Sequence, residues 1–133
     1  MLYRAGYKYQ LAADEYFYTS FRPVNTIRAP RITLYTDGAM IVNEGYSWDG
    51  ATGIPDLRTN MRASCGHDAL YQLMRLKKLD WKEYGKADDD FAKWMREAGA
   101  WSITVNTLRW GLQQMAGTFA KPENRREIYT VCQ

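Results

Sequence analysis

The stretch RITLYTDGAMIVN, residues 31–43, has the pattern of a β-hairpin. Two short runs that contain β-branched and aromatic residues flank Asp37-Gly38, and this dipeptide favours the positive φ angles of a type I′ turn. We therefore predict two antiparallel strands joined by that turn. The alternation of residue types at 7–11 and the aromatic run at 15–21 predict two further short strands upstream.

After the hairpin, the spacing of apolar residues becomes helical. Residues 62–79 repeat apolar side chains, together with His67, at the spacing of one helix face, and residues 87–98 form a second apolar stripe. A third helix is expected at 102–116 and a last strand at 128–131. A short turn separates the first two helices, so we expect them to pack antiparallel. Strands followed by helices indicate an α+β fold with one small antiparallel sheet and about three helices.

Length and charge restrict the class of protein. The 133 residues suit one domain, 1–133, and a net charge of +3 argues against a dedicated nucleic-acid partner. The basic residues from Arg58 to Lys82, including Arg75, fit a solvated face better than a site for anionic headgroups or nucleic acid. Two cysteines are too few for the disulfide framework of a small secreted domain. No segment resembles a signal peptide or a transmembrane span, so we expect neither Sec export nor membrane integration.

Residues 44–60 lack periodicity and are rich in glycine, which predicts a long loop. Apolar anchors such as Trp48 favour an ordered, functional loop. Asp49 offers a carboxylate and Gly50 a backbone carbonyl, which are the oxygen ligands that Ca²⁺ prefers, and Asp68 on the first helix would add another. When the loop is taken alone, a plain glycine turn with an Asx hydrogen bond is the favoured explanation.

The chain has a single histidine, His67, on the apolar face of the first predicted helix. A buried imidazole needs a hydrogen-bond partner. Three aspartates stand at 88–90, where an acidic first turn of the second helix would complement the helix dipole. Asp88 lies at the inner edge of the apolar stripe, whereas Asp89 and Asp90 are expected to point outward. A contact between His67 and Asp88 therefore depends on how the two helices cross.

Other chemistries lack the residues they need. A metal phosphohydrolase of the His-Asp type requires more histidines, and a zinc site requires four suitable ligands. Ser64 is not surrounded by a nucleophile elbow, and no phosphate-binding or dinucleotide-binding glycine motif occurs.

Three blocks of sequence resemble a domain-of-unknown-function family that is common in bacteriophages and prophages. They are GYSWDGATGIP at 45–55, RASCGHDALYQ at 62–72 and ADDDF at 87–91. The family pattern is a hairpin, a Gly-aromatic-x-x-Asp-Gly-Ala-Ser/Thr loop, then Arg-Ala-Ser-x-x-His-Asp-x-Leu-Tyr and Ala-Asp-x-x-Phe. The resemblance covers residues 32–99, about half the chain. It implies a phage-encoded protein that is located in the host cytoplasm after synthesis, with incorporation into the virion left open.

The same blocks are distantly similar to prokaryotic-type secreted phospholipases A2. Those enzymes have an Asp-Gly-x-Ser loop, Cys-x-x-His-Asp-x-x-Tyr on one helix, and Asp-x-x-Phe on an antiparallel partner. The similarity implies that His67 is a general base, that Asp88 orients it, and that Ca²⁺ holds the ester oxyanion. By the same resemblance Asp49, Asp68 and the carbonyl of Gly50 are the calcium ligands. Trp48 and Tyr71, aromatic members of these blocks, are the candidate substrate-binding residues.

Two classes of function stay open at this point. The first is a calcium-assisted hydrolase of a lipid ester or another cell-envelope substrate. The second is non-enzymatic: a tail or baseplate component that binds neighbouring virion proteins, or an intracellular effector that binds a host protein. In the second class the four candidate polar residues, Asp49, His67, Asp68 and Asp88, form a buried network that holds the loop against the helices.

Overall fold

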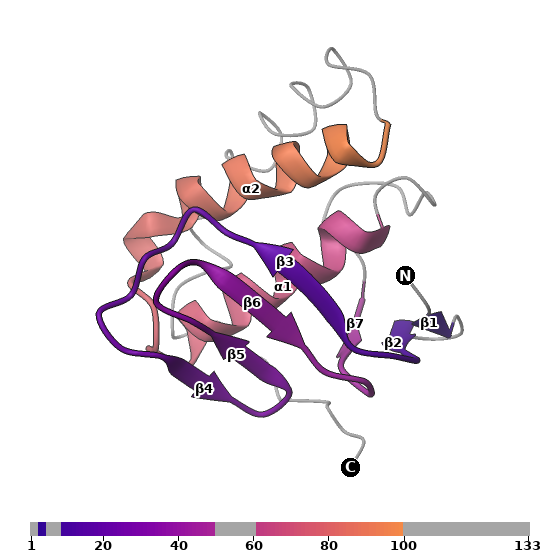
Figure 1. Ribbon diagram of the computed structural model, residues 1–133, viewed down its shortest axis with the longest axis horizontal. Coiled ribbons are helices and arrows are strands. Elements are labelled where there is room, and N and C mark those ends of the chain that lie inside the picture. The colour runs from indigo at the N-terminus through magenta and orange to yellow at the C-terminus, as the bar shows by residue number, and fades with distance from the viewer. Residues whose placement is uncertain (1–2, 5–8, 50–60, 100–133) are drawn as a thin grey trace. The chain divides into compact units, whose positions relative to one another are not determined.

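The computed structural model describes residues 3–4, 9–49 and 61–99 of the chain (Figure 1). Within these residues, the strands up to Asp49 belong to one compact unit and the helices from Met61 onward belong to a second. Strands precede helices along the chain, which confirms the α+β class. The helix predicted at 102–116 and the strand predicted at 128–131 lie outside the described residues.

The described strands form two small antiparallel sheets. One sheet has the strand order β1-β2-β7 and the other has the order β3-β6-β5-β4. The strands are β1 (Tyr3–Arg4), β2 (Tyr9–Leu11), β3 (Glu15–Tyr18), β4 (Ile27–Ala29), β5 (Ile32–Leu34), β6 (Ala39–Val42) and β7 (Ser47–Trp48). A single sheet was predicted, and this detail is wrong because β7, inside the expected irregular loop, pairs with β2. A two-residue strand is too short to show a periodicity of its own.

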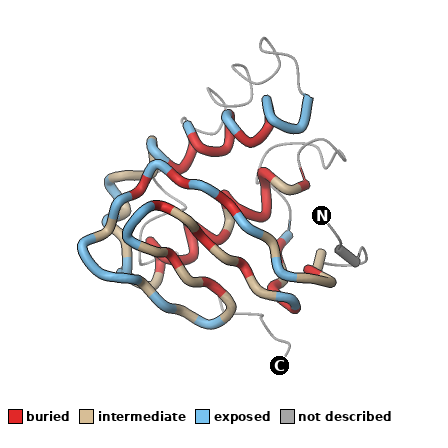
Figure 2. Tube along the Cα trace, viewed as in Figure 1, coloured by how far each residue is buried: buried red, intermediate tan, exposed pale blue. Residues whose placement is uncertain are grey.

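The four-stranded sheet has one buried face. Phe17, Met40 and Leu34 lie side by side across β3, β6 and β5, and all three side chains are buried. On β3 the alternate residues Tyr16 and Tyr18 are 62% and 67% exposed. This alternation is the pattern of a sheet with one packed and one solvated face, and Figure 2 shows it as alternating colours along β3.

The β5–β6 hairpin is confirmed, but its predicted type I′ turn is wrong. Gly38 has a φ of +93°, whereas Asp37 does not have a positive φ. The Gly38 amide donates to the Tyr35 carbonyl at 3.0 Å, and the Tyr35 amide donates to the Ala39 carbonyl at 2.8 Å. This is the longer hairpin connection in which a single glycine takes the left-handed conformation. The side chain of Asp37 accepts a hydrogen bond from the Ala39 amide, which stabilises the turn without a positive φ at Asp37.

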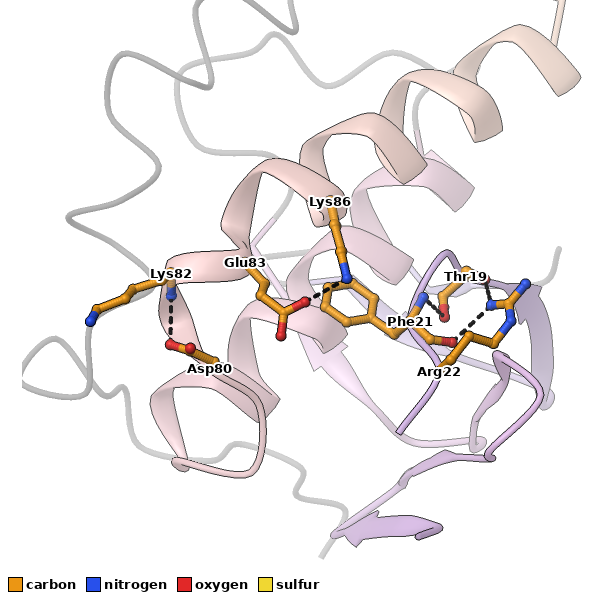
Figure 3. Close-up of polar contacts among 7 residues, drawn as sticks. All are labelled: Thr19, Phe21, Arg22, Asp80, Lys82, Glu83 and Lys86. Atoms are coloured by element: carbon orange, nitrogen blue, oxygen red, sulfur yellow. Dashed lines mark hydrogen bonds and ion pairs between the residues drawn. The ribbon is translucent and has the colours of Figure 1, made fainter. Parts of the chain in front are cut away.

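Glycine is also required at position 38 because the chain that follows β3 passes close to it. Thr19 donates to the Gly38 carbonyl from both its amide, at 2.8 Å, and its hydroxyl, at 2.9 Å. The Arg22 guanidinium bonds the carbonyls of Thr19 and Phe21, as Figure 3 shows. A Cβ at position 38 would lie 2.7 Å from the Thr19 carbonyl oxygen.

The described helices are α1 (Met61–Arg75), the 3₁₀ turn η2 (Trp81–Glu83) and α2 (Tyr84–Glu97). The α1 and α2 helices pack against each other. Arg62 in the first turn of α1 pairs with Glu97 at the end of α2, with an N···O distance of 3.7 Å, whereas Tyr71 bonds Asp88 nearer the other ends. These contacts confirm an antiparallel pair.

The start of α2 is earlier than predicted. The side chain of Asp80, the residue before η2, accepts a hydrogen bond from the Lys82 amide (Figure 3). Nζ of Lys86 lies 2.7 Å from Oε2 of Glu83 (Figure 3). Because α2 begins at Tyr84, residues 88–90 lie beyond its first turn, and the predicted acidic first turn is wrong. Asp88 is buried and Asp89 exposed, as predicted, but Asp90 is buried, against the prediction.

The helix α1 is buried on nearly every side. All of its residues except Arg62 and Asp68 are buried, including the predicted face that carries His67 and Tyr71 (Figure 2). The sequence predicted one buried stripe, as for a surface helix. The small residues Ser64 and Gly66 lie among those buried beyond that stripe. By contrast α2 alternates between buried and exposed residues, as its pattern predicted (Figure 2).

We expect Lys77→Gly to stabilise the protein, because Lys77 ends α1 in a conformation that favours glycine. Its φ is +63°, its amide donates to Met74, and the Lys78 amide donates to Leu73, which together make a Schellman motif. Relief of the strain should raise the free energy of unfolding by roughly 1 kcal/mol. Urea unfolding measures this change. Lys78→Gly, which replaces an exposed neighbour without a positive φ, should not stabilise; equal gains in both variants would contradict the explanation.

Candidate functional site

The α1 and α2 helices bring the predicted pair His67 and Asp88 into contact. The Nε2 atom of His67 lies 2.7 Å from Oδ1 of Asp88. The Asp88 side chain is 0% exposed and that of His67 is 8% exposed, so the bond is shielded from water. An ionised carboxylate accepts hydrogen bonds only, so Nε2 carries the proton. The other ring nitrogen, Nδ1, is then left with its lone pair, and no described residue hydrogen-bonds it.

Tyr71 is a second donor to the same carboxylate. Its hydroxyl donates to Oδ1 of Asp88 at 2.8 Å, one helical turn after His67 on α1. The remaining oxygen, Oδ2, is buried and has no hydrogen-bond partner among the described residues. Two donors on one oxygen fix the carboxylate in position, because they constrain its direction from two points on α1.

Aromatic rings enclose the imidazole. The centroids of His67 and Tyr71 are 4.2 Å apart, and Phe91 from α2 meets the imidazole edge-on at 5.3 Å. Such contacts restrict rotation of the ring and exclude water from the His67–Asp88 bond. Tyr71 follows His67 by four residues on α1, and Phe91 follows Asp88 by three residues on α2. Both are helical spacings, so the apolar periodicity that predicted the helices also positions this site.

We expect Tyr71→Phe to cost about 1–2 kcal/mol of stability at pH 7, because buried Asp88 loses a donor. Burial, and then the Asp88 carboxylate, raise the pKa of the Tyr71 hydroxyl above its ordinary value of 10.0. The stability from keeping the phenol protonated is therefore fully present below pH 10 and is lost as the pH rises further. Urea unfolding at pH 7 and above pH 10 should show that the variant loses less of its free energy of unfolding than wild type does as the pH rises. The exposed control Tyr18→Phe should match wild type, and identical slopes for all three proteins would contradict this account.

A second polar cluster lies further along α1. Arg75 is 2% exposed, its Nη2 lies 3.7 Å from Oδ1 of Asp68, and its Nε and Nη2 both donate to Oε1 of Gln72. The prediction that Arg75 belongs to a solvated face is wrong. The spacings of seven and three residues place these side chains on one side of a helix. The sequence signal for the cluster was present in this spacing, but it did not stand out among the other basic residues.

The surroundings of Asp68 do not fit a calcium ion. A divalent ion at its carboxylate would lie close to the Arg75 guanidinium, and two such charges repel by roughly 7 kcal/mol at about 5 Å with an effective dielectric of about 20. Across residues 9–49 and 61–99, no three His, Cys, Asp or Glu side chains are grouped to hold a metal. Gly50 lies outside the described residues, and Asp49 is exposed after β7. Calcium binding by Asp49 and Gly50 stays a prediction.

The two candidate substrate-binding residues are both buried. Trp48 is enclosed in the strand unit, where its ring lies 5.7 Å from Tyr9 and stacks on Tyr46 at 6.4 Å. Tyr71 has its hydroxyl committed to Asp88. Their role in substrate binding stays a prediction, and the described geometry gives each of them a packing or positioning role.

Comparison with known proteins gives no match: no family model, no curated protein and no solved structure is similar to this chain. The resemblances drawn from its motifs therefore stay predictions. None of the helices that the structure describes is long and apolar enough to cross a membrane.

The chemistry that the site can perform follows from its geometry: a buried carboxylate, held by Tyr71, orients an imidazole whose second nitrogen can take a proton.

Proposed function

We propose that this chain is a phage-encoded hydrolase in which His67 is the general base and Asp88 orients it. The observation that carries the proposal is the buried 2.7 Å bond between Nε2 of His67 and Oδ1 of Asp88. A histidine held by a carboxylate in this way is the arrangement by which many hydrolases activate water or a hydroxyl group. The substrate we propose is an ester of a lipid or of another cell-envelope molecule.

The proposed reaction uses the two ring nitrogens for different tasks. Nδ1 of His67 takes a proton from a water molecule as the water oxygen attacks the ester carbonyl. The imidazolium that forms keeps the proton on Nε2, which donates to Oδ1 of Asp88, and the negative charge of the carboxylate stabilises the imidazolium. When the tetrahedral intermediate collapses, Nδ1 returns the proton to the departing alcohol oxygen. No step is assigned to calcium.

A second candidate function is favoured by the exposed tyrosines of the strand unit. Tyr16 and Tyr18 stand on the same side of β3, which is an edge strand of its sheet. Exposed tyrosines are enriched at protein interfaces. These rings support the alternative of a virion component that binds its neighbours, in which the His67–Asp88 bond would serve only to stabilise the helices.

The test of the proposal is a hydrolysis screen with purified full-length protein. Short-chain phospholipids, chromogenic fatty-acid esters and peptidoglycan fragments would be assayed with the wild type and with His67→Ala as the reference for background hydrolysis. Saturable turnover by the wild type above that reference supports the proposal. Equal rates for the two proteins on every substrate would exclude it and leave the binding role of Tyr16 and Tyr18 as the stronger candidate.

A further inference from the structure

The outer face of the β3-β6-β5-β4 sheet carries a row of side chains, one from each strand. In strand order they are Tyr16, Ile41, Thr33 and Arg28, and each lies directly opposite the next in the register. Residues directly opposite one another in an antiparallel pair point to the same side of the sheet. Because β3 and β4 are the two ends of the strand order (Figure 1), the row begins with an aromatic ring and ends with a guanidinium. At about 4.8 Å per strand, its ends lie roughly 14 Å apart.

The two ends of this row are accessible and chemically complementary. Tyr16 is 62% exposed, and Tyr18, two residues further along β3 on the same side, is 67% exposed. Arg28 is exposed, and its guanidinium makes no hydrogen bond or ion pair with any residue that the structure describes. A guanidinium is attracted to the face of an aromatic ring. One copy of the sheet cannot bring the two groups together, because they stand on its opposite edge strands.

The outer face has the composition of a protein–protein interface. Arg28 is the only charged side chain among the residues of β3, β4, β5 and β6 that point outward. These residues are Tyr16, Tyr18, Arg28, Thr33, Ala39 and Ile41. Tyrosine and arginine are enriched in interface cores, whereas lysine, glutamate and aspartate are depleted there. A nucleic acid is disfavoured as the occupant, since a single cation does not make the basic groove that follows a phosphate backbone.

Two-fold symmetry determines how a second copy fits this face. An axis that runs along the strands, between β6 and β5, would bring Tyr16 of each copy over Arg28 of the other. An axis that runs across the strands would instead place Arg28 over Arg28, and like charges opposed across an interface are disfavoured. Charge therefore selects the first arrangement. Its two sheets pack face to face with their strands aligned, which is a common packing of sheets.

We infer that two copies of this chain associate through the outer face of this sheet, with Tyr16 of each copy on Arg28 of the other. The four short strands make a face about 19 Å wide and about 13 Å long, so the interface belongs to the small class below about 1,200 Å². Such an interface is weak, and we expect the dimer to form at high protein concentration. The inference does not depend on the proposed hydrolase function, because it uses no residue of the His67–Asp88 site.

Sedimentation equilibrium of the full chain, from roughly 10 µM to about 1 mM, measures this association. The wild type should show a monomer–dimer equilibrium in this range. Arg28→Glu and Tyr16→Lys should each weaken the dimer at least about tenfold, because each substitution removes both contacts between a cation and a ring. The matched control Lys82→Glu makes the same charge reversal at an exposed residue outside this sheet and should change the affinity by less than about twofold.

An equimolar mixture of Arg28→Glu and Tyr16→Lys tests the pairing itself. In the mixed dimer, the ammonium introduced at position 16 faces the carboxylate introduced at position 28, and the other contact is the native one. The mixture should therefore associate at least about fivefold more tightly than either variant alone. Thermal melts establish that each variant is folded. A wild type that stays monomeric throughout, folded single variants that associate as the wild type does, or a mixture no tighter than its components would overturn the inference.

Discussion

Asp88→Asn is expected to remove almost all hydrolysis while the helices stay folded. Asparagine keeps an oxygen at the position of Oδ1, where His67 and Tyr71 both donate. Its amide nitrogen replaces Oδ2, which has no partner among the described residues, so no existing bond is broken. Loss of a fully buried negative charge also lowers the cost of desolvation. The two N–H donors that replace Oδ2 are buried without an acceptor, and their cost of about 1–3 kcal/mol offsets that gain. The melting temperature should therefore change little.

The rate should nevertheless fall by about 10³–10⁴, because a neutral amide cannot stabilise the imidazolium that forms when His67 takes a proton. The measurement is kcat/KM on the best substrate of the screen, with a thermal melt of the same preparation. Asp89→Asn is the matched control, since it makes the same change at the exposed neighbouring position. Retention of activity in Asp88→Asn would reject the catalytic pair, and a large drop in melting temperature would instead favour a purely structural network.

The sequence predicted that His67 and Asp88 point inward because helical periodicity indicates which side chains face a partner helix. His67 shares a face with Leu70 and Met74, and Asp88 lies three residues before Phe91, so both were expected to point inward. Their contact could not be predicted, since it depends on the register between two helices that a single sequence does not specify. The 2.7 Å bond follows from an antiparallel crossing that pairs Tyr71 with Asp88 and Arg62 with Glu97.

The features that were not predicted depend on partners that the sequence pattern does not identify. The pairing of β7 with β2 joins residues 47–48 to 9–10, and the two-residue β7 is too short to show a pattern of its own. The burial of Asp90 and Arg75 was missed because charged side chains are expected on the surface unless their partners are known. The hairpin turn differed because Asp37 stabilises it through its side chain rather than by adopting a positive φ.

Phe91→Ala is expected to have the largest effect on stability among substitutions around the site. Phe91 is 0% exposed, and its removal leaves a cavity where the two helices pack. Replacing a buried phenylalanine by alanine costs about 3–5 kcal/mol, which corresponds to a fall of roughly 10–20 °C in melting temperature. Phe91→Leu keeps most of the volume and should cost about 1 kcal/mol. Urea unfolding of the two variants measures both values.

The same substitution should also reduce activity in the protein that remains folded. The edge of Phe91 meets the His67 ring at a centroid distance of 5.3 Å, so its loss frees the imidazole to rotate away from Asp88 and admits water to their bond. Turnover measured well below the melting temperature should therefore fall in Phe91→Ala and recover largely in Phe91→Leu. If Phe91→Ala were destabilised and yet fully active at that temperature, packing around the ring would not be what holds His67 in its productive orientation.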